Sequence, residues 1–247
     1  PTKPAAFTGL LNDYSGAAAA YSLRLLDNTY TGDAIVVTTN GSDSASIGFV
    51  NNELDTASLE AFAGGGDAYV SVWYDQSGNG NNATNTNFSE MPKIVSGGTF
   101  MGYIENQVVN FAVLLSAFSY TAGTPFSSFM VVQNFGKSVF GGTNSGSIYY
   151  GVAENTTSSA TAGFGSVYYY SNGSSIGTQR RDIYNAATTS FAQLTTLATL
   201  SIGSSEAVLG YNSSGYNSTR MKEYIIYDNQ SVSRTGVENN IITHYGF

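Results

Sequence analysis

The sequence has 247 residues, of which 42% are hydrophobic and only 11% are charged, and its formal net charge is −8. The negative charge excludes a nucleic-acid-binding protein, and the 14 Phe and 18 Tyr exclude a disordered chain, which would lack such residues. Because the sequence has no cysteine, disulfides and thiolate metal sites are excluded, and no apolar run reaches the roughly 18 residues that membrane insertion needs.

The first part of the chain is predicted to contain both helices and strands. Residues 1–13 are interpreted as an entry linker that leads into a single domain over residues 14–247. The alanine run within residues 16–26 predicts a short helix, because alanine has the highest helix propensity. Strands are predicted over residues 33–39, 46–50 and 68–74, and a second short helix, capped by Asp55, is predicted through Phe62. The strand over residues 68–74 is apolar on both faces, so we expect it to be central and covered.

From residue 99 to residue 228 the sequence predicts one strand after another, separated by Gly, Asn and Ser. The pair Asn172-Gly173 indicates a hairpin, because both residues tolerate positive φ. The clearest strands are expected over residues 129–135, 147–152, 165–170, 188–194, 199–202 and 221–228. Many short strands at this spacing indicate an all-β fold, which we expect to be a concanavalin A-like jelly-roll sandwich of two antiparallel sheets.

The last segment of the chain is predicted to be a helix that packs on the sandwich. Thr235 and Glu238 fit a capping box at its start. An apolar stripe at helical spacing supplies the packing face, formed by Val237, Ile241, Ile242 and Tyr245.

Two segments resemble known protein families. The first runs from AAAAYSLRLL at residues 17–26 to VWYDQSGNGNNAT at residues 72–84, and the second is MKEYIIYDNQSVSRTGVENNIITHYGF at residues 221–247. Both resemble concanavalin A-like, laminin-G-like domains of bacterial surface proteins and of phage tail or capsid-decoration proteins. The first segment is also similar to the catalytic sandwich of arabinofuranosidase B-type glycosidases, although that domain usually contains cysteine and no catalytic carboxylate of that family matches a position here. The resemblance implies the fold and leaves both a binding protein and a hydrolase open.

A loop after residue 74 has the side chains of a candidate calcium site. Asp75, Ser77 and Asn79 place oxygen atoms at alternating positions, and Ca²⁺ takes 6–8 oxygen ligands in such loops. Only Asp75 is charged, and Thr86 stands where a calcium loop has its final Glu. The competing interpretation is a structural turn in which Asp75 accepts backbone hydrogen bonds.

Few residues in this sequence match the catalytic motifs of hydrolases. The motif G-x-S-x-G occurs at residues 173–177, but it lies in a predicted hairpin rather than at a turn from strand to helix. Glycoside hydrolysis needs two carboxylates that face one another. Most acidic residues are scattered singly, and four that could meet in space are Glu105, Glu154, Glu206 and Glu223.

Tyrosine is the abundant candidate for glycan binding. Aromatic rings with a polar tip stack on sugar rings, and amides bond to sugar hydroxyls. The residues proposed to bind glycan are Tyr149, Tyr169, Tyr211, Asn212 and Tyr216. The competing interpretation is cross-strand packing, which uses the same side chains.

These observations favour a non-catalytic recognition or structural domain at a virion or cell surface, outside the cell. Its expected partners are host-surface or matrix polysaccharide, other particle proteins, or neighbouring copies of itself in a homo-oligomer. The alternatives are a glycoside hydrolase of the arabinofuranosidase type and a purely structural filament or shell subunit. No cofactor is expected beyond the candidate Ca²⁺.

Overall fold

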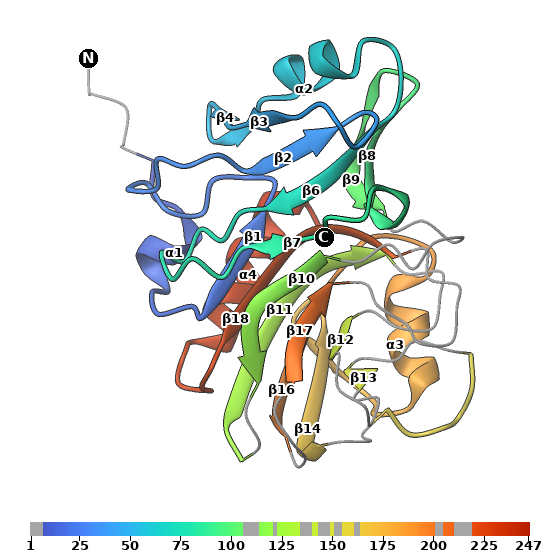
Figure 1. Cartoon of the computed structure of the whole chain (residues 1–247). Helices are drawn as coiled ribbons and strands as arrows, with labels where there is room; N and C mark the ends of the chain where they lie inside the picture. Colours follow the sequence, from blue (N-terminus) through green and yellow to red (C-terminus); the bar gives the residue numbers. More distant parts are fainter. Residues whose placement is uncertain are drawn as a thin grey trace.

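The computed structural model describes most of the chain. The described residues are 7–105, 114–120, 123–133, 140–142, 149–150, 155–160, 164–200, 205–209 and 219–247. They form an all-β sandwich with four short α-helices (Figure 1), which confirms the predicted fold class. Within these residues, no helix combines the length and apolar character that a membrane span requires.

The first layer of the sandwich is an antiparallel sheet built around a central pair of long strands. Its strands, in spatial order, are β15 (Ser174–Ile176), β14 (Phe164–Ser171), β16 (Ala192–Leu200), β11 (Pro125–Gln133), β18 (Arg220–Tyr227) and β1 (Ala19–Ser22). The β14–β15 hairpin turns at Asn172 (φ 46°) and Gly173 (φ 80°), as the sequence predicts.

The second layer has shorter strands and continues the hydrogen bonding of the first. Its strands, in spatial order, are β13 (Tyr149–Tyr150), β12 (Phe140–Gly142), β17 (Ser205–Leu209), β10 (Leu114–Tyr120), β7 (Ala83–Thr84), β6 (Ala68–Trp73), β2 (Ile35–Thr38) and β3 (Ala45–Ile47). The hairpin of β8 (Lys93–Ser96) and β9 (Thr99–Glu105) pairs with β6 on one side and with β18 on the other. It therefore joins the two layers into one hydrogen-bonded network.

Four helices and a two-stranded sheet complete the fold. They are α1 (Leu10–Asp13), α2 (Thr56–Ala63), α3 (Arg180–Ala187), α4 (Arg234–Tyr245), and the pair β4 (Phe49–Val50) and β5 (Glu53–Leu54). One core cluster fills the space between the layers, with Trp73 and Val70 from β6 and Tyr224 from β18 among its members. A second cluster holds α1 and α4 against the outer face of the first layer through Leu10 and Val237.

The segment over residues 16–26 is not a helix, contrary to the prediction from its alanine run. Residues 19–22 form β1, which pairs with β18 so that Ala19 lies opposite Ile226. All four side chains of β1 are buried, with Ala19 and Tyr21 in the core between the layers and Ala20 in the outer cluster. Small alanine side chains fit a strand that is covered on both faces, and this packing outweighs helix propensity.

Other local predictions also require correction. Leu10 and Leu11 are 1% and 5% exposed, so the end of the expected entry linker belongs to the packed domain. The stretches 188–194 and 199–202 were expected to be separate strands, but one strand, β16, runs over 192–200 after the unpredicted helix α3. Irregular pairing along β6 places Val70 and Trp73 together in the core, although simple alternation would put them on opposite faces.

The helix caps are confirmed at one helix and corrected at the other. Asp55 caps α2 by accepting a hydrogen bond from Ser58 N, as predicted. Ser233 caps α4 by accepting from Gly236 N, whereas Thr235 lies inside the helix. Glu238 therefore forms no capping box with Thr235, and it pairs with Arg234 one turn earlier.

Candidate functional site

A pocket of about 380 Å³ opens between the last turn of α4 and strands β5, β9 and β18. Its walls combine apolar, aromatic and ionisable side chains, which is the usual composition of a small-molecule site. The lining residues are Leu23, Glu53, Leu54, Thr56, Phe100, Gly102, Lys222, His244 and Tyr245. They come from five separate parts of the sequence, which the sandwich brings together.

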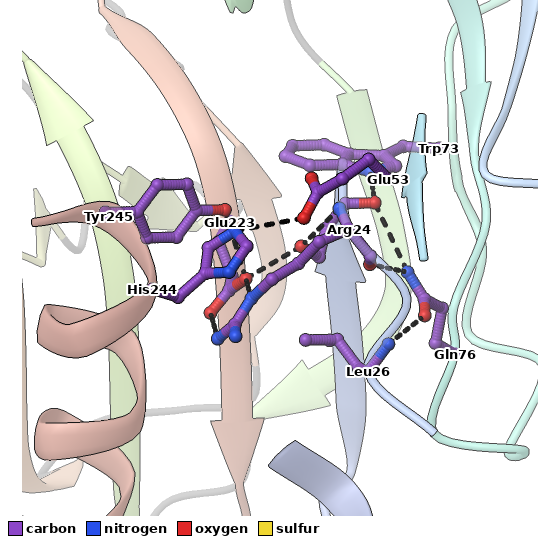
Figure 2. Close-up of polar contacts among 9 residues, drawn as sticks. Arg24, Leu26, Glu53, Trp73, Gln76, Glu223, His244 and Tyr245 are labelled. Carbon is purple, nitrogen blue, oxygen red and sulfur yellow. Dashed lines mark hydrogen bonds and ion pairs between the residues drawn. The ribbon is translucent and has the colours of Figure 1, made fainter. Parts of the chain in front are cut away.

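A buried ion pair between Arg24 and Glu223 lies beside Tyr245, which lines this pocket (Figure 2). Arg24 Nε lies 2.7 Å from Glu223 Oε2 and Arg24 Nη2 lies 3.0 Å from Oε1, so the pair is bidentate. The two side chains are 9% and 0% exposed. Ser22 Oγ and the Tyr245 hydroxyl also donate to Glu223 Oε2, at 2.7 and 3.2 Å. Glu223 is thus fully engaged and inaccessible to a ligand.

Gln76 fixes the main chain that carries Arg24. Its Nε2 donates to the carbonyl oxygens of Ser22 and Arg24, at 3.2 and 3.0 Å, and its Oε1 accepts from Leu26 N at 2.8 Å. Trp73 Nε1 adds a bond of 3.3 Å to Ser22 O. The glutamine is only 2% exposed, so it acts as a rigid clamp that holds the guanidinium of Arg24 toward β18 (Figure 2).

Glu53 supplies the accessible carboxyl group of the pocket. Its side chain is 58% exposed, and burial together with the nearby Glu223 raises its pKa, against the opposing effect of Arg24. His244 Nε2 lies 3.6 Å from Glu53 Oε1. Burial, Arg24 and Lys222 lower the pKa of His244, so the imidazole is mostly neutral at pH 7 and this contact is not a strong ion pair.

Lys222 supplies a cation on another wall. Its Nζ lies 4.5 Å from the centroid of the Phe191 ring and 5.6 Å from that of Tyr245. Burial lowers its pKa. The pocket therefore offers a carboxyl group, an ammonium group and aromatic surface within one cavity, which suits a ligand with hydroxyls and a ring.

The loop proposed to bind calcium is a compact turn. Asp75 is 4% exposed, and its two carboxylate oxygens accept from Ala20 N, Ser77 N, Ser77 Oγ and Asn81 N at 2.8–2.9 Å. Asn79 Nδ2 donates to Ala17 O and Ala18 O. Within the described ranges, no three acidic or histidine side chains gather as a metal site would need. These contacts favour the structural turn, and calcium binding stays a prediction.

The tyrosines proposed to bind glycan fall into two groups. Tyr211, Asn212 and Tyr216 lie outside the described residues, as does the side chain of Tyr149 on β13. Tyr169 is 3% exposed, lies in the core cluster and donates its hydroxyl to Ala160 O. The structure thus corrects the proposal for Tyr169, because a ring in the core is not available to a ligand.

Of the four carboxylates that could have met, the structure describes the side chains of two, and these two belong to separate ion pairs. Glu105 on β9 pairs with Arg220 at 2.8 Å, whereas Glu223 pairs with Arg24. Glu154 and the side chain of Glu206 lie outside the described residues. Ser175 of the G-x-S-x-G motif lies on β15 of a hairpin, as expected.

The pocket residues Glu53, Lys222, His244 and Tyr245 were not predicted as a site. A usable signal was the concentration of Lys222, Glu223, His244 and Tyr245 in the two elements of the second resembling segment. These residues lie near Glu53 because of the position of the turn that connects β4 and β5. The sequence pattern does not predict which distant residues this turn contacts.

Solved structures of arabinofuranosidases share this fold. An arabinofuranosidase complexed with arabinofuranosyl-α-1,2-xylobiose superposes with a TM-score of 0.58 at 13% identity, over 92% of this chain and 62% of that one. A GH54 α-L-arabinofuranosidase soaked with a cyclic sulfate inhibitor, and a mutant soaked with 4-nitrophenyl α-L-arabinofuranoside, each give a TM-score of 0.59 with the same identity and coverage.

This likeness establishes the β-sandwich fold and agrees with the resemblance to the arabinofuranosidase B-type sandwich. The chain spans 62% of the length of these solved structures. No protein-family model matches the sequence, and no curated protein sequence matches it.

Proposed function

We propose that this chain is a glycoside hydrolase domain of the arabinofuranosidase type that acts on arabinose-containing glycans. The observation that carries the proposal is the match of 92% of the chain to the sandwich of arabinofuranosidases. One of those structures is complexed with arabinofuranosyl-α-1,2-xylobiose, and another was soaked with 4-nitrophenyl α-L-arabinofuranoside.

The pocket adds chemistry that suits such a reaction. A glycosidase needs a carboxylic acid that protonates the leaving oxygen, and an acid with a raised pKa performs this step near neutral pH. Glu53 lines the pocket and has a raised pKa because of burial and the proximity of Glu223. We assign Glu53 as the candidate proton donor.

The test is release of arabinose from arabinofuranosyl-α-1,2-xylobiose, because its leaving group is a sugar hydroxyl that must be protonated. We expect turnover by the unmodified protein and a fall of about 10²–10⁴-fold in Glu53→Gln, the usual contribution of a general acid. Glu90→Gln is the control, because Glu90 ends the short helix at Phe88–Glu90 and does not line the pocket. An absence of turnover on arabinofuranosides would refute the proposal, and equal rates in both variants would remove Glu53 from the reaction.

A second candidate function is glycan recognition without cleavage. It is favoured because glycoside hydrolysis needs two carboxyl groups. Glu223 is fully buried and paired, so Glu53 alone offers a carboxyl group among the described lining residues. Under this proposal arabinofuranosyl-xylobiose binds without yielding free arabinose, and calorimetry combined with product analysis separates the two functions.

The location and partners that the sequence predicts for a recognition domain apply to this second candidate function. The support for it is the sparse charge, 11% of residues, together with the abundance of hydroxyl and amide side chains. We propose host-surface or matrix polysaccharide and neighbouring copies as partners, at a virion or cell surface. Pull-down with intact particles and a glycan array would test that setting.

A further inference from the structure

Lys222 places an uncompensated positive charge in the pocket. Elsewhere in the described part of the chain, the cations Arg24, Lys93, Arg220 and Arg234 each pair with a carboxylate. Across those same residues, no carboxylate lies within 4.0 Å of Lys222 Nζ, whose close neighbours are the rings of Phe191 and Tyr245. The charge of Arg24, which lies beside Tyr245 of the pocket, is already matched by Glu223.

These surroundings destabilise the charged form of Lys222 unless an anion binds beside it. Burial lowers the pKa of Lys222, which means that the pocket removes hydration from the ammonium group. Contact with aromatic faces makes up for only part of that lost hydration. An anionic group that bonds to Nζ inside the pocket restores the missing partner, and the aromatic rings hold the ammonium group in place for it.

The other residues that line the pocket indicate which further chemical groups the anionic ligand should have. Glu53 is an acceptor for hydroxyl groups, Thr56 both donates and accepts, and Phe100 offers an apolar face on which a sugar ring can stack. A volume of about 380 Å³ lies within the range of small-molecule sites. A compact ring with several hydroxyls and one carboxylate meets all of these conditions.

We propose that the pocket binds a single hexuronic acid residue of the glycan, with its carboxylate on Lys222, its hydroxyls on Glu53 and Thr56, and its ring against Phe100. This inference rests on the proposed action on glycans and names the acidic sugar that its site selects. Among the lining residues that the structure describes, Lys222 is the one such cation, so one acidic residue is bound. The net charge of −8 repels a long polyanion, so an isolated acidic branch or chain end fits better than the interior of a polyuronate.

The experiment compares two ligands that differ only in charge, methyl glucuronide and its methyl ester. Calorimetry at pH 7 measures their affinities for the unmodified protein, for Lys222→Met and for Lys93→Met. Methionine keeps an unbranched apolar stem, and Lys93 is a matched control, since it also lies over an aromatic ring, that of Tyr69 at 5.6 Å, but does not line the pocket. Fluorescence of Trp73 verifies that both variants are folded.

We expect the acid to bind the unmodified protein and Lys93→Met at least about tenfold more tightly than the ester, a difference of about 1.4 kcal/mol. In Lys222→Met the acid should fall to the affinity of the ester. Added salt should weaken binding of the acid and leave the ester unchanged. Equal affinity of acid and ester, an equal loss in both lysine variants, or no saturable binding of either ligand overturns the inference.

The outcomes also separate this inference from the proposed hydrolase function. Binding of the acid without turnover of arabinofuranosides retains the acidic-sugar site and rejects the hydrolase. Turnover without any preference for the acid retains the hydrolase and rejects the role of Lys222.

Discussion

Glu53 and Glu223 both carry carboxyl groups near α4, but their immediate neighbours make them differ in accessibility to a ligand. Glu223 has no exposed side-chain surface and is held by a bidentate arginine, a serine and a tyrosine, whereas the Glu53 side chain is 58% exposed and lies 3.6 Å from the imidazole of His244. The first arrangement stabilises the fold, and the second leaves a carboxyl group free for a ligand or a proton transfer.

Removing one charge of the buried pair should cost far more stability than removing one charge of an exposed pair. Glu223→Gln leaves the guanidinium of Arg24 buried and uncompensated, which should lower the free energy of unfolding by about 3–5 kcal/mol. Glu105→Gln breaks a pair whose side chains are 26% and 30% exposed, and it should cost about 0–1 kcal/mol. Urea denaturation measures both values, and equal losses would contradict the distinction.

The protonation of His244 should depend on its position in the pocket. It is the single histidine of the chain, so its ring protons can be followed alone by NMR. Burial, Arg24 and Lys222 lower its pKa, and we expect a midpoint below the ordinary value of about 6.5. Lys222→Met should move the midpoint upward. A midpoint at or above 6.5 in the unmodified protein would contradict this account.

The same shift predicts the sign of a stability change with pH. The unfolded chain binds the proton more readily than the folded one, so this contribution to stability is present above pH 6.5 and is lost as pH falls through the folded pKa. His244→Gln should flatten that part of the stability profile, measured by thermal unfolding between pH 5 and pH 8.

Sequence reasoning at the residue scale located the fold-stabilising Asp75 turn but not the pocket. Asp75 bonds to residues within its own loop and to one strand, and a local pattern of Asn, Ser and Gly indicates this turn. The pocket requires that Glu53 approach His244 and Lys222, which are distant in sequence. Such approaches depend on how sheets and helices pack, and no single-sequence pattern records them.

At the scale of elements, hydrophobic alternation predicted most strands, and propensity failed where packing outweighed it. The strands β2, β11 and β18 contain β-branched and aromatic runs and lie close to their expected positions. The alanine run became β1 because both of its faces are covered. The helix α3 was missed because only Ile183 and Ala187 are buried, which gives a short helix little apolar periodicity to detect.

The structure and the sequence pattern assign different N-cap residues to α4. Ser233→Ala removes the oxygen that accepts from Gly236 N and should cost about 0.5–2 kcal/mol. Thr235→Ala changes an exposed position inside the helix and should alter stability by less than about 0.5 kcal/mol. Chemical denaturation of the two variants decides between the two caps, and a larger loss in Thr235→Ala would support the sequence pattern.

At the scale of the whole molecule, the two layers should unfold together. The core between them includes β6 and β18, and the β8–β9 hairpin links their hydrogen bonding. Trp73 is the single tryptophan, is 1% exposed and packs against Tyr21 with ring centroids 5.9 Å apart. Its fluorescence and the far-ultraviolet circular dichroism should therefore share one urea midpoint. Separate midpoints would show that the layers are independent units.

The pairing of β1 with β18 sets the time at which this protein can finish folding during its synthesis. Ala19 meets Ile226 and Tyr21 meets Tyr224, so β1 lacks this strand partner until β18 has been synthesised. Until then Ala20, Tyr21 and the leucines of α1 have no surface to cover them. Such long-range closure slows folding and exposes apolar segments to association, so this protein should depend on chaperones that cover β1 until β18 has been synthesised.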